Sequence, residues 1–301
     1  MGSPLRILLP PSRKVGDQIR VQIFYSTTKD RPAVQWLGKE RKGRPSRSCS
    51  AKLNQSTRGA WRLCSSPSVK ITYNAKVACV LPVLLSAIPV SPPSDGPAHD
   101  DKEIGKDVVT YEYKQPVPIP PYLIAIAIGN FRYRALPKVE GKEWSTGIWA
   151  EPELIDAAYW EFSKDTGRFL ATAEKILPPY RFGVYDLLVL PPSFPYGGME
   201  NACLTFLTPT LLTGDRTLVD VVVHELTRSW FGNGVTQANS THFWLNEGWT
   251  TYIERLLLQL LHTPADRGFS FLIGYKSLQD ALKQYEENPK YQRLVIDSET
   301  G

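Results

Sequence analysis

Cysteine is scarce in this sequence, and the few cysteines form no pattern. Cys49, Cys64, Cys79 and Cys203 are scattered through 301 residues without a Cys-x-x-Cys pair. Such spacing is untypical of cysteine-bound zinc and of the disulfide frameworks of small secreted proteins. We therefore expect free thiols in a reducing compartment.

Long apolar runs are also absent. The run Val77–Val90 has only fourteen residues and contains Pro82 and Pro89, so it is too short to cross a bilayer. The first residues, MGSPLRILLPPSRK, lack the apolar core of a signal peptide, and Arg6 stands where a myristoylation signal needs Ser or Thr. We expect a cytoplasmic protein without a membrane span.

Aliphatic residues are few and periodicity is lacking between residues 38 and 66. Eight Lys and Arg against Glu40 give the stretch from Lys39 to Arg62 a charge of +7, so the rest of the chain sums to −2 of the net +5. Three interpretations stay open: a solvated disordered insert, a displaced reading frame, or a basic arm for nucleic acid. The arm would need interleaved aromatics, and only Trp61 is present. We expect a poorly ordered segment and no nucleic-acid partner.

The remaining sequence has enough apolar residues for a folded core of one or two domains, with 42% hydrophobic residues and 8 Trp. Alternating apolar residues, separated by Pro, Gly and Asp, predict strands at 19–25, 33–37, 69–73, 77–81, 108–113 and within 122–128. Helical periodicity is expected over 149–177 and 266–285, and Asp186–Leu190 is expected to be a short buried strand.

One histidine stands in a chemically suggestive context. His224 and Glu225 follow an apolar run and open a His-Glu-x-x-x segment that predicts a buried helix. On such a helix positions 224 and 228 share a face, so two imidazoles there would hold one metal ion. Position 228 is Arg, however, and a further carboxylate, Glu247, follows nineteen residues later in Trp-Leu-Asn-Glu-Gly. The other histidines, His99, His242 and His262, have no ligand-like spacing.

The segments HELTRSWFGN and WLNEG, with PPSFPYGGMENACLTF at 191–206, resemble the gluzincin metallopeptidases of the leukotriene A(4) hydrolase and aminopeptidase B type. The resemblance implies an α+β fold, with a partial antiparallel β-domain in residues 1–135 that includes the irregular basic segment 38–66. A thermolysin-like α/β catalytic domain, truncated at its C-terminus, would occupy residues 136–301. The family's catalytic tyrosine and helical C-terminal domain would lie beyond Gly301.

The resemblance also implies an activity and a set of site residues. The expected activity is zinc-dependent removal of N-terminal residues from peptides, with hydrolysis of a fatty-acid epoxide as a second activity, by a monomer. His224 and Glu247 would bind one Zn²⁺, and Glu225 would polarise the bound water. The expected substrate-binding residues are Pro195, Tyr196, Gly197, Gly198, Met199, Glu200 and Asn201, with Glu200 pairing with the substrate's free amine. Glu254 is expected either to orient a ligand or to form an ordinary surface ion pair.

Arg228 is the serious departure from this pattern. A guanidinium stays protonated, has no lone pair to donate, and places a positive charge at the position of a metal ligand. We expect zinc binding to be impaired and Arg228 to face Glu225 and Glu247 in a buried ion pair. The alternative function is a catalytically inactive relative, or an aberrant gene product, that at most binds peptide N-termini.

Overall fold

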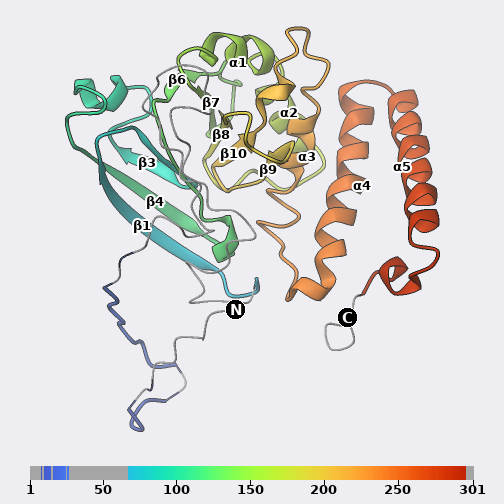
Figure 1. Cartoon of the computed structure of the whole chain (residues 1–301), viewed down its shortest axis with the longest axis horizontal. Coiled ribbons are helices and arrows are strands. Elements are labelled where there is room, and N and C mark those ends of the chain that lie inside the picture. Colours follow the sequence, from blue (N-terminus) through green and yellow to red (C-terminus); the bar gives the residue numbers. More distant parts are fainter. Residues whose placement is uncertain (1–7, 9, 15, 25, 27–66, 296–301) are drawn as a thin grey trace.

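The computed structural model describes residues 8, 10–14, 16–24, 26 and 67–295. Figure 1 shows antiparallel strands on one side, a mixed sheet with its helices in the centre, and two long helices on the other side. The expected α+β architecture is confirmed. The basic segment 38–66 and the strand predicted at 33–37 lie outside the described residues.

The first layer is antiparallel. Strands β1 (Ile71–Cys79), β4 (Val109–Ile119) and β3 (Ile88–Ser91) form one sheet in the order β1-β4-β3, and β2 (Val83–Leu85) pairs with β5 (Ile126–Ile128). The strands predicted at 69–73 and 77–81 are joined into the single strand β1, because the residues between them keep their pairing with β4. A core cluster fills this layer with Val83, Leu85, Ala87, Val109, Tyr111 and Tyr113.

The second layer is a five-stranded mixed sheet in the order β6-β7-β8-β10-β9. Its strands are β6 (Arg132–Ala135), β7 (Ser145–Ala150), β8 (Val184–Val189), β9 (Gly198–Met199) and β10 (Leu204–Leu207). The strands β7, β8 and β10 run parallel and are buried along most of their length, as expected of strands covered on both faces. The division into domains at residue 135 stays a prediction, since β6 pairs with β7 across it.

Five α-helices accompany this sheet within the described residues. They are α1 (Ile155–Phe162), α2 (Thr166–Ala173), α3 (Val221–Thr227), α4 (Phe243–Leu261) and α5 (Pro264–Gln284). The predicted helical region 149–177 is wrong at its start, because Trp149 lies in β7 and pairs with Leu188. Pro152 follows this strand and disfavours helical backbone angles at Glu151, so α1 begins only after it. Short 3-10 helices are found at Ala98–Asp101, Pro121–Leu123, Pro209–Leu211, Ser240–His242 and Pro289–Gln292.

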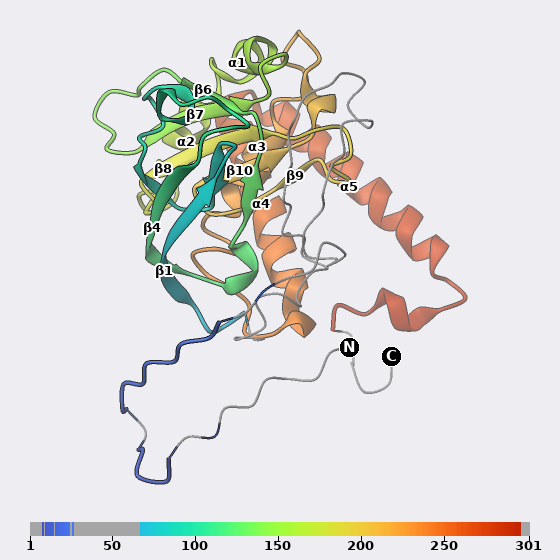
Figure 2. The same cartoon turned by 60° about the vertical axis from the view of Figure 1, so that its left-hand side comes forward.

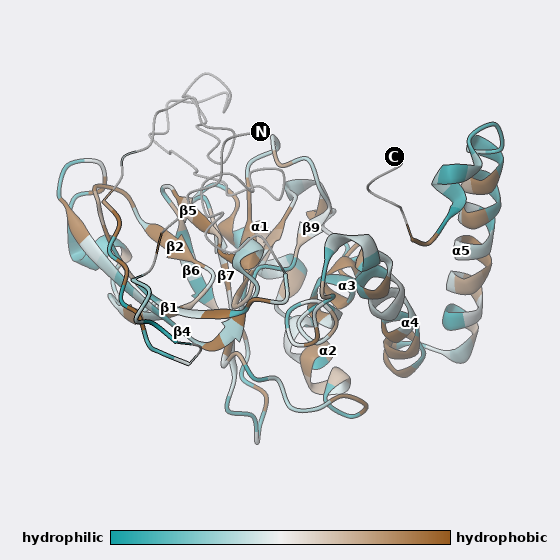
Figure 3. Ribbon diagram, turned by 90° about the horizontal axis from the view of Figure 1, so that it is seen from below, coloured by the Kyte–Doolittle hydropathy of each residue, from teal (hydrophilic) through white to brown (hydrophobic). Residues whose placement is uncertain are grey.

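Helices α4 and α5 form an antiparallel hairpin beside the mixed sheet (Figure 2). Helix α4 buries Ile253 and Leu257 against the central core, whereas no residue of α5 is buried. Figure 3 shows α5 as the outermost element, with hydrophobic and hydrophilic residues interspersed along it. Within the described residues, no helix is both long and apolar enough to cross a membrane.

The strand predicted at 19–25 is wrong for the residues that the structure describes. Residues 19–24 are exposed and are not in a strand. A strand needs a neighbour that accepts and donates its backbone hydrogen bonds, and no described strand pairs with these residues. Alternation of side chains is therefore insufficient here to specify a sheet.

A buried carboxylate fixes the chain just before α3. Glu161 in α1 is fully buried and accepts hydrogen bonds from the Thr213 hydroxyl at 2.9 Å, the Gly214 amide at 2.9 Å and the Arg216 amide at 2.8 Å. Because all three donors belong to the loop that precedes α3, this single side chain fixes the position of that loop.

Replacing Glu161 with Gln should lower the free energy of unfolding by about 2 kcal/mol, because the new amide group presents donors to donors. Urea unfolding of Glu161→Gln measures this loss. Asp156→Asn on the same helix is the matched control. Asp156 pairs with Arg134 while its side chain is 89% exposed, and exposed pairs contribute at most about 1 kcal/mol. Equal stability losses in the two variants would contradict the proposed role of Glu161.

Candidate active site

The candidate site lies where α3, α4 and the strand β9 meet. His224 and Glu225 are on α3, Arg228 is its C-terminal cap residue with helical backbone angles, and Glu247 is in the second turn of α4. Because the helical geometry continues through residue 228, the side chains of His224 and Arg228 lie on the same face. The predicted local placement on a helix is therefore confirmed.

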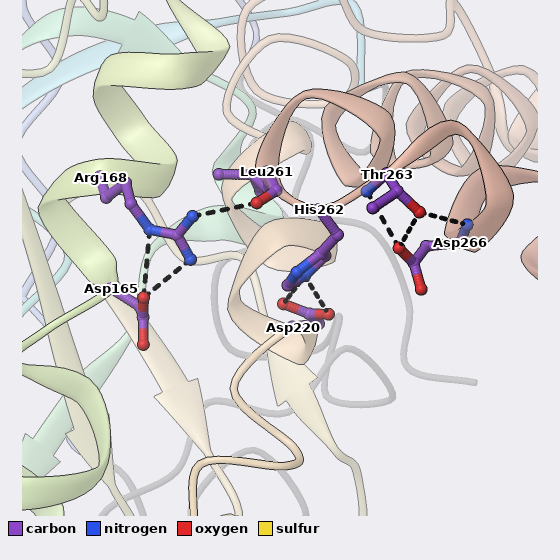
Figure 4. Close-up of polar contacts among 7 residues, drawn as sticks. All are labelled: Asp165, Arg168, Asp220, Leu261, His262, Thr263 and Asp266. Atoms are coloured by element: carbon purple, nitrogen blue, oxygen red, sulfur yellow. Dashed lines mark hydrogen bonds and ion pairs between the residues drawn. The ribbon is translucent and has the colours of Figure 1, made fainter.

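Contacts at the far ends of the helices set the position of α4 relative to α3 (Figure 4). Asp220, the residue that precedes α3, contacts His262 at 3.0 Å directly after α4. Arg168 of α2 donates to the carbonyl of Leu261 at 3.2 Å and is itself held by Asp165 at 2.8 Å. His262, for which the sequence suggests no role, thus helps to dock the helix that supplies Glu247.

The strand β9 brings the Gly-Gly-Met-Glu-Asn segment to the same place. It is the edge strand of the mixed sheet and pairs with β10 through Met199 and Gly198. A side chain at position 198 would overlap the Glu225 carboxylate, so glycine permits the close approach of β9 to α3. Glu200 and Asn201 follow and are each 4% exposed, whereas Pro195, Tyr196 and Gly197 are exposed.

Arg228 is the centre of the cluster. Its Nε donates to His224 Nε2 at 3.2 Å, its Nη1 donates to Glu200 Oε1 at 3.2 Å, and its Nη2 forms a short bond to Glu247 Oε2. The ion pair with Glu247 agrees with the sequence-based prediction. The second carboxylate is Glu200 rather than Glu225, because β9 places Glu200 beside the guanidinium.

The charge state of Arg228 follows from this setting. Burial lowers the pKa of the guanidinium, but attraction to Glu200 and Glu247 raises it by more, so the group stays protonated. Its side chain is 10% exposed, compared with 4% for Glu200 and 37% for Glu247. The site therefore contains a permanent, largely buried positive charge.

His224 is held on its other side by Glu254. The distance from Nδ1 to Glu254 Oε2 is 2.9 Å, so Glu254 orients the imidazole. The contact with the Arg228 Nε–H needs a free lone pair on Nε2, and a neutral ring with its proton on Nδ1 satisfies both contacts. The lone pair that would bind a metal ion is thus already used.

Glu225 is 7% exposed beside Gly198. Burial, followed by repulsion from Glu200, raises the pKa of Glu225. Both effects favour the protonated carboxyl group. A general base must be deprotonated to accept a proton, so both effects oppose the role expected of Glu225.

The residues present do not fit a zinc ion. Zinc needs unprotonated nitrogen and oxygen donors that converge on one point, and the Arg228 N–H groups occupy Nε2 of His224 and an oxygen of Glu247. Within the part of the chain that the structure describes, no group of three His, Cys, Asp or Glu side chains is placed to hold a metal ion.

Three neighbours of the cluster were assigned no role from the sequence. Lys70 donates to the carbonyls of Asn233 at 3.0 Å and Gly234 at 2.6 Å, and so ties the loop after α3 to the start of β1. The Asn233 amide group donates to the carbonyl of Glu200 at 2.9 Å. Tyr122 is close enough to Glu200 and Arg228 for their charges to affect its pKa, which burial raises. Lys70 and Tyr122 come from distant segments of the sequence, so only the fold brings them to the cluster.

Comparison with known proteins identifies what this chain is similar to. Residues 160–296 match the Peptidase family M1 domain. The chain is 41% identical, over 98% of its length, to a leukotriene A-4 hydrolase homolog of Botryotinia fuckeliana, and 40% identical, also over 98%, to leucine aminopeptidase 2 of Sclerotinia sclerotiorum. Residues 160–296 are thus similar to an M1 peptidase domain, and nearly the whole chain is similar to part of each of these relatives. The chain spans 45% and 48% of the lengths of these two relatives.

Solved M1 structures agree with this similarity. The structure of yeast LTA4 hydrolase in complex with bestatin is 37% identical, with a TM-score of 0.74, over 90% of this chain and 40% of that chain. An M1 zinc metallopeptidase of Deinococcus radiodurans is 21% identical with a TM-score of 0.54, and shows the fold alone. The chain thus has an antiparallel β-layer and part of an M1 catalytic domain.

Proposed function

We propose that this chain carries the site of an M1 aminopeptidase of the leukotriene A(4) hydrolase type but, as it stands, does not hydrolyse its substrates. The observation that supports the proposal is the set of bonds from Arg228 to His224 and Glu247. These are the two residues that the motif assigns to the metal. A guanidinium in their midst both uses their donor atoms and repels a divalent cation.

The substrate class expected for the site is a peptide with a free N-terminus. Leucine aminopeptidase 2 is the name of several relatives. The buried Glu200, directly after the half-buried edge strand β9, suits an extended chain that ends in an ammonium group. The relative called leukotriene A-4 hydrolase homolog motivates the second expected substrate, a fatty-acid epoxide. Since both reactions would need the same metal, Arg228 would block both. A cytoplasmic location and a monomeric state stay predictions.

Metal analysis of the unaltered chain tests the proposal. Protein purified without chelator and dialysed against micromolar zinc should hold far less than one zinc ion per chain, because two ligands beside a fixed positive charge form a poor site. The same preparation should release no product from leucine p-nitroanilide above a protein-free blank. Near-stoichiometric zinc would show that Arg228 moves aside, and the proposed function would then be wrong.

A further inference from the structure

All three nitrogens of the Arg228 guanidinium donate hydrogen bonds, and each acceptor is an atom that suits a cation. The acceptors are His224 Nε2, Glu200 Oε1 and Glu247 Oε2. They come from α3, from the segment after β9 and from α4, so three separate parts of the fold converge on one positive charge. Within the described residues, Arg228 is the cation ion-paired with Glu200.

Glu200 needs such a cation. A carboxylate that is 4% exposed is strongly destabilised if it is charged and unpaired, so it either finds a positive partner or gains a proton. An external ligand that binds Glu200 would have to bring its own cation to this carboxylate. The position for that cation is filled by a group of the chain itself.

We propose that Arg228 is an internal occupant that takes two positions at once, the metal position between His224 and Glu247 and the position of a ligand's ammonium group beside Glu200. The inference rests on the proposed function in taking Glu200 as the amine-binding carboxylate. Its consequence is that the unaltered chain does not recognise a free peptide N-terminus, even though the residues for doing so are present.

The energetics favour the internal group over an incoming ammonium. To reach Glu200, a ligand would have to displace Nη1 of Arg228, while the remaining bonds to His224 and Glu247 keep the guanidinium in place. Until it moves, two like charges would share a poorly solvated space, which is strongly unfavourable. A peptide also loses translational freedom when it binds, and this loss opposes binding. The internal ion pair has no such cost, because Arg228 is part of the chain.

Peptide binding in EDTA tests this inference without any metal. The probes are an alanine tripeptide labelled at its C-terminus and the same peptide with an acetylated N-terminus. The unaltered chain should bind the two with affinities that agree within about twofold, since no charge-assisted bond distinguishes them. An Arg228→Gln chain frees Glu200 and should prefer the free amine by roughly ten- to a hundredfold.

Two controls separate the effect from a general change in charge. Arg134→Gln removes a positive charge from an exposed pair with Asp156 and should leave the two affinities equal. Adding Glu200→Gln to Arg228→Gln should abolish the gained preference. If Arg228→Gln does not fold, as judged by circular dichroism, the unaltered chain decides: equal affinities support the inference.

A tenfold or greater preference of the unaltered chain for the free amine would overturn the inference, as would a folded Arg228→Gln chain without any preference. These results are distinguishable from failure of the proposed function. Stoichiometric zinc in the unaltered chain contradicts the proposed function, whereas amine selectivity in EDTA contradicts this inference alone.

Discussion

An Arg228→His chain is expected to bind one zinc ion, where the unaltered chain binds little or none. The substitution places a second imidazole one helical turn after His224, on the same face of the helix that now carries the guanidinium. With Glu247 it completes a set of three protein ligands and removes the positive charge. Zinc affinity should therefore rise by several orders of magnitude.

Metal analysis after dialysis and thermal unfolding in buffered zinc provide two independent readouts. Zinc that binds only the folded state stabilises it by about 2.7 kcal/mol when its free concentration is a hundred times Kd. The Tm of the histidine variant should rise with added zinc, and that of the unaltered chain should not.

Arg228→Met is the matched control, because it removes the same charge without adding a ligand. Its zinc content should stay low. Equal zinc uptake by the Met and His variants would show that loss of the positive charge alone opens the site, and the idea that a third ligand is missing would then be wrong.

Stability should depend on pH through Asp186, a residue of strand β8 in the mixed sheet that is 4% exposed. Burial raises the pKa of Asp186 to about 7, against the lowering effect of hydrogen bonds from Trp149 and Gly147. In the unfolded chain its pKa returns to about 3.9. Between these values the folded state holds a proton that the unfolded state has lost. This contribution to stability is therefore complete below about pH 4 and is lost as pH rises through about 7, with an upper bound of about 4 kcal/mol.

The Asp186→Asn chain removes this titration while its amide oxygen can still accept the bond from Trp149, which the carboxylate receives at 3.0 Å. The free energy of unfolding is measured in urea from pH 5 to pH 8. The value for the variant should increase relative to that of the unaltered chain as pH rises. The exposed carboxylate Glu112, paired with Lys76, supplies the comparison: Glu112→Gln should show a difference from the unaltered chain that varies by at most about 1 kcal/mol over the same range. A pH-independent difference for Asp186→Asn would contradict the raised pKa.

The sequence by itself was sufficient where the relevant interactions are local. The spacing of His224 and Arg228 and the apolar run before them predicted the helix α3 and the misfit of arginine at a metal position. A helix fixes the relative directions of side chains three and four residues apart, so these features follow from the order of residues alone. The same holds for the short buried strand β8.

The sequence was insufficient where the secondary structure of a segment depends on pairing with another strand. The sequence placed Trp149 in a helix, but Trp149 pairs with Leu188 of β8. It placed residues 19–24 in a strand, but no described strand pairs with them. Alternation shows which side chains share a face, but a strand exists only if another segment of the chain lies beside it.

The identity of the partners of Arg228 was decided by the tertiary structure. Glu247 and Glu225 were the expected carboxylates, yet in place of Glu225 it is Glu200, 28 residues before Arg228, that accepts the second bond. The reason is the edge position of β9, which carries Glu200 under α3, where glycine at 198 leaves room for the approach. The residue that excludes a metal is thus determined by the sequence, whereas the carboxylates it neutralises are determined by how the sheet packs against the helices.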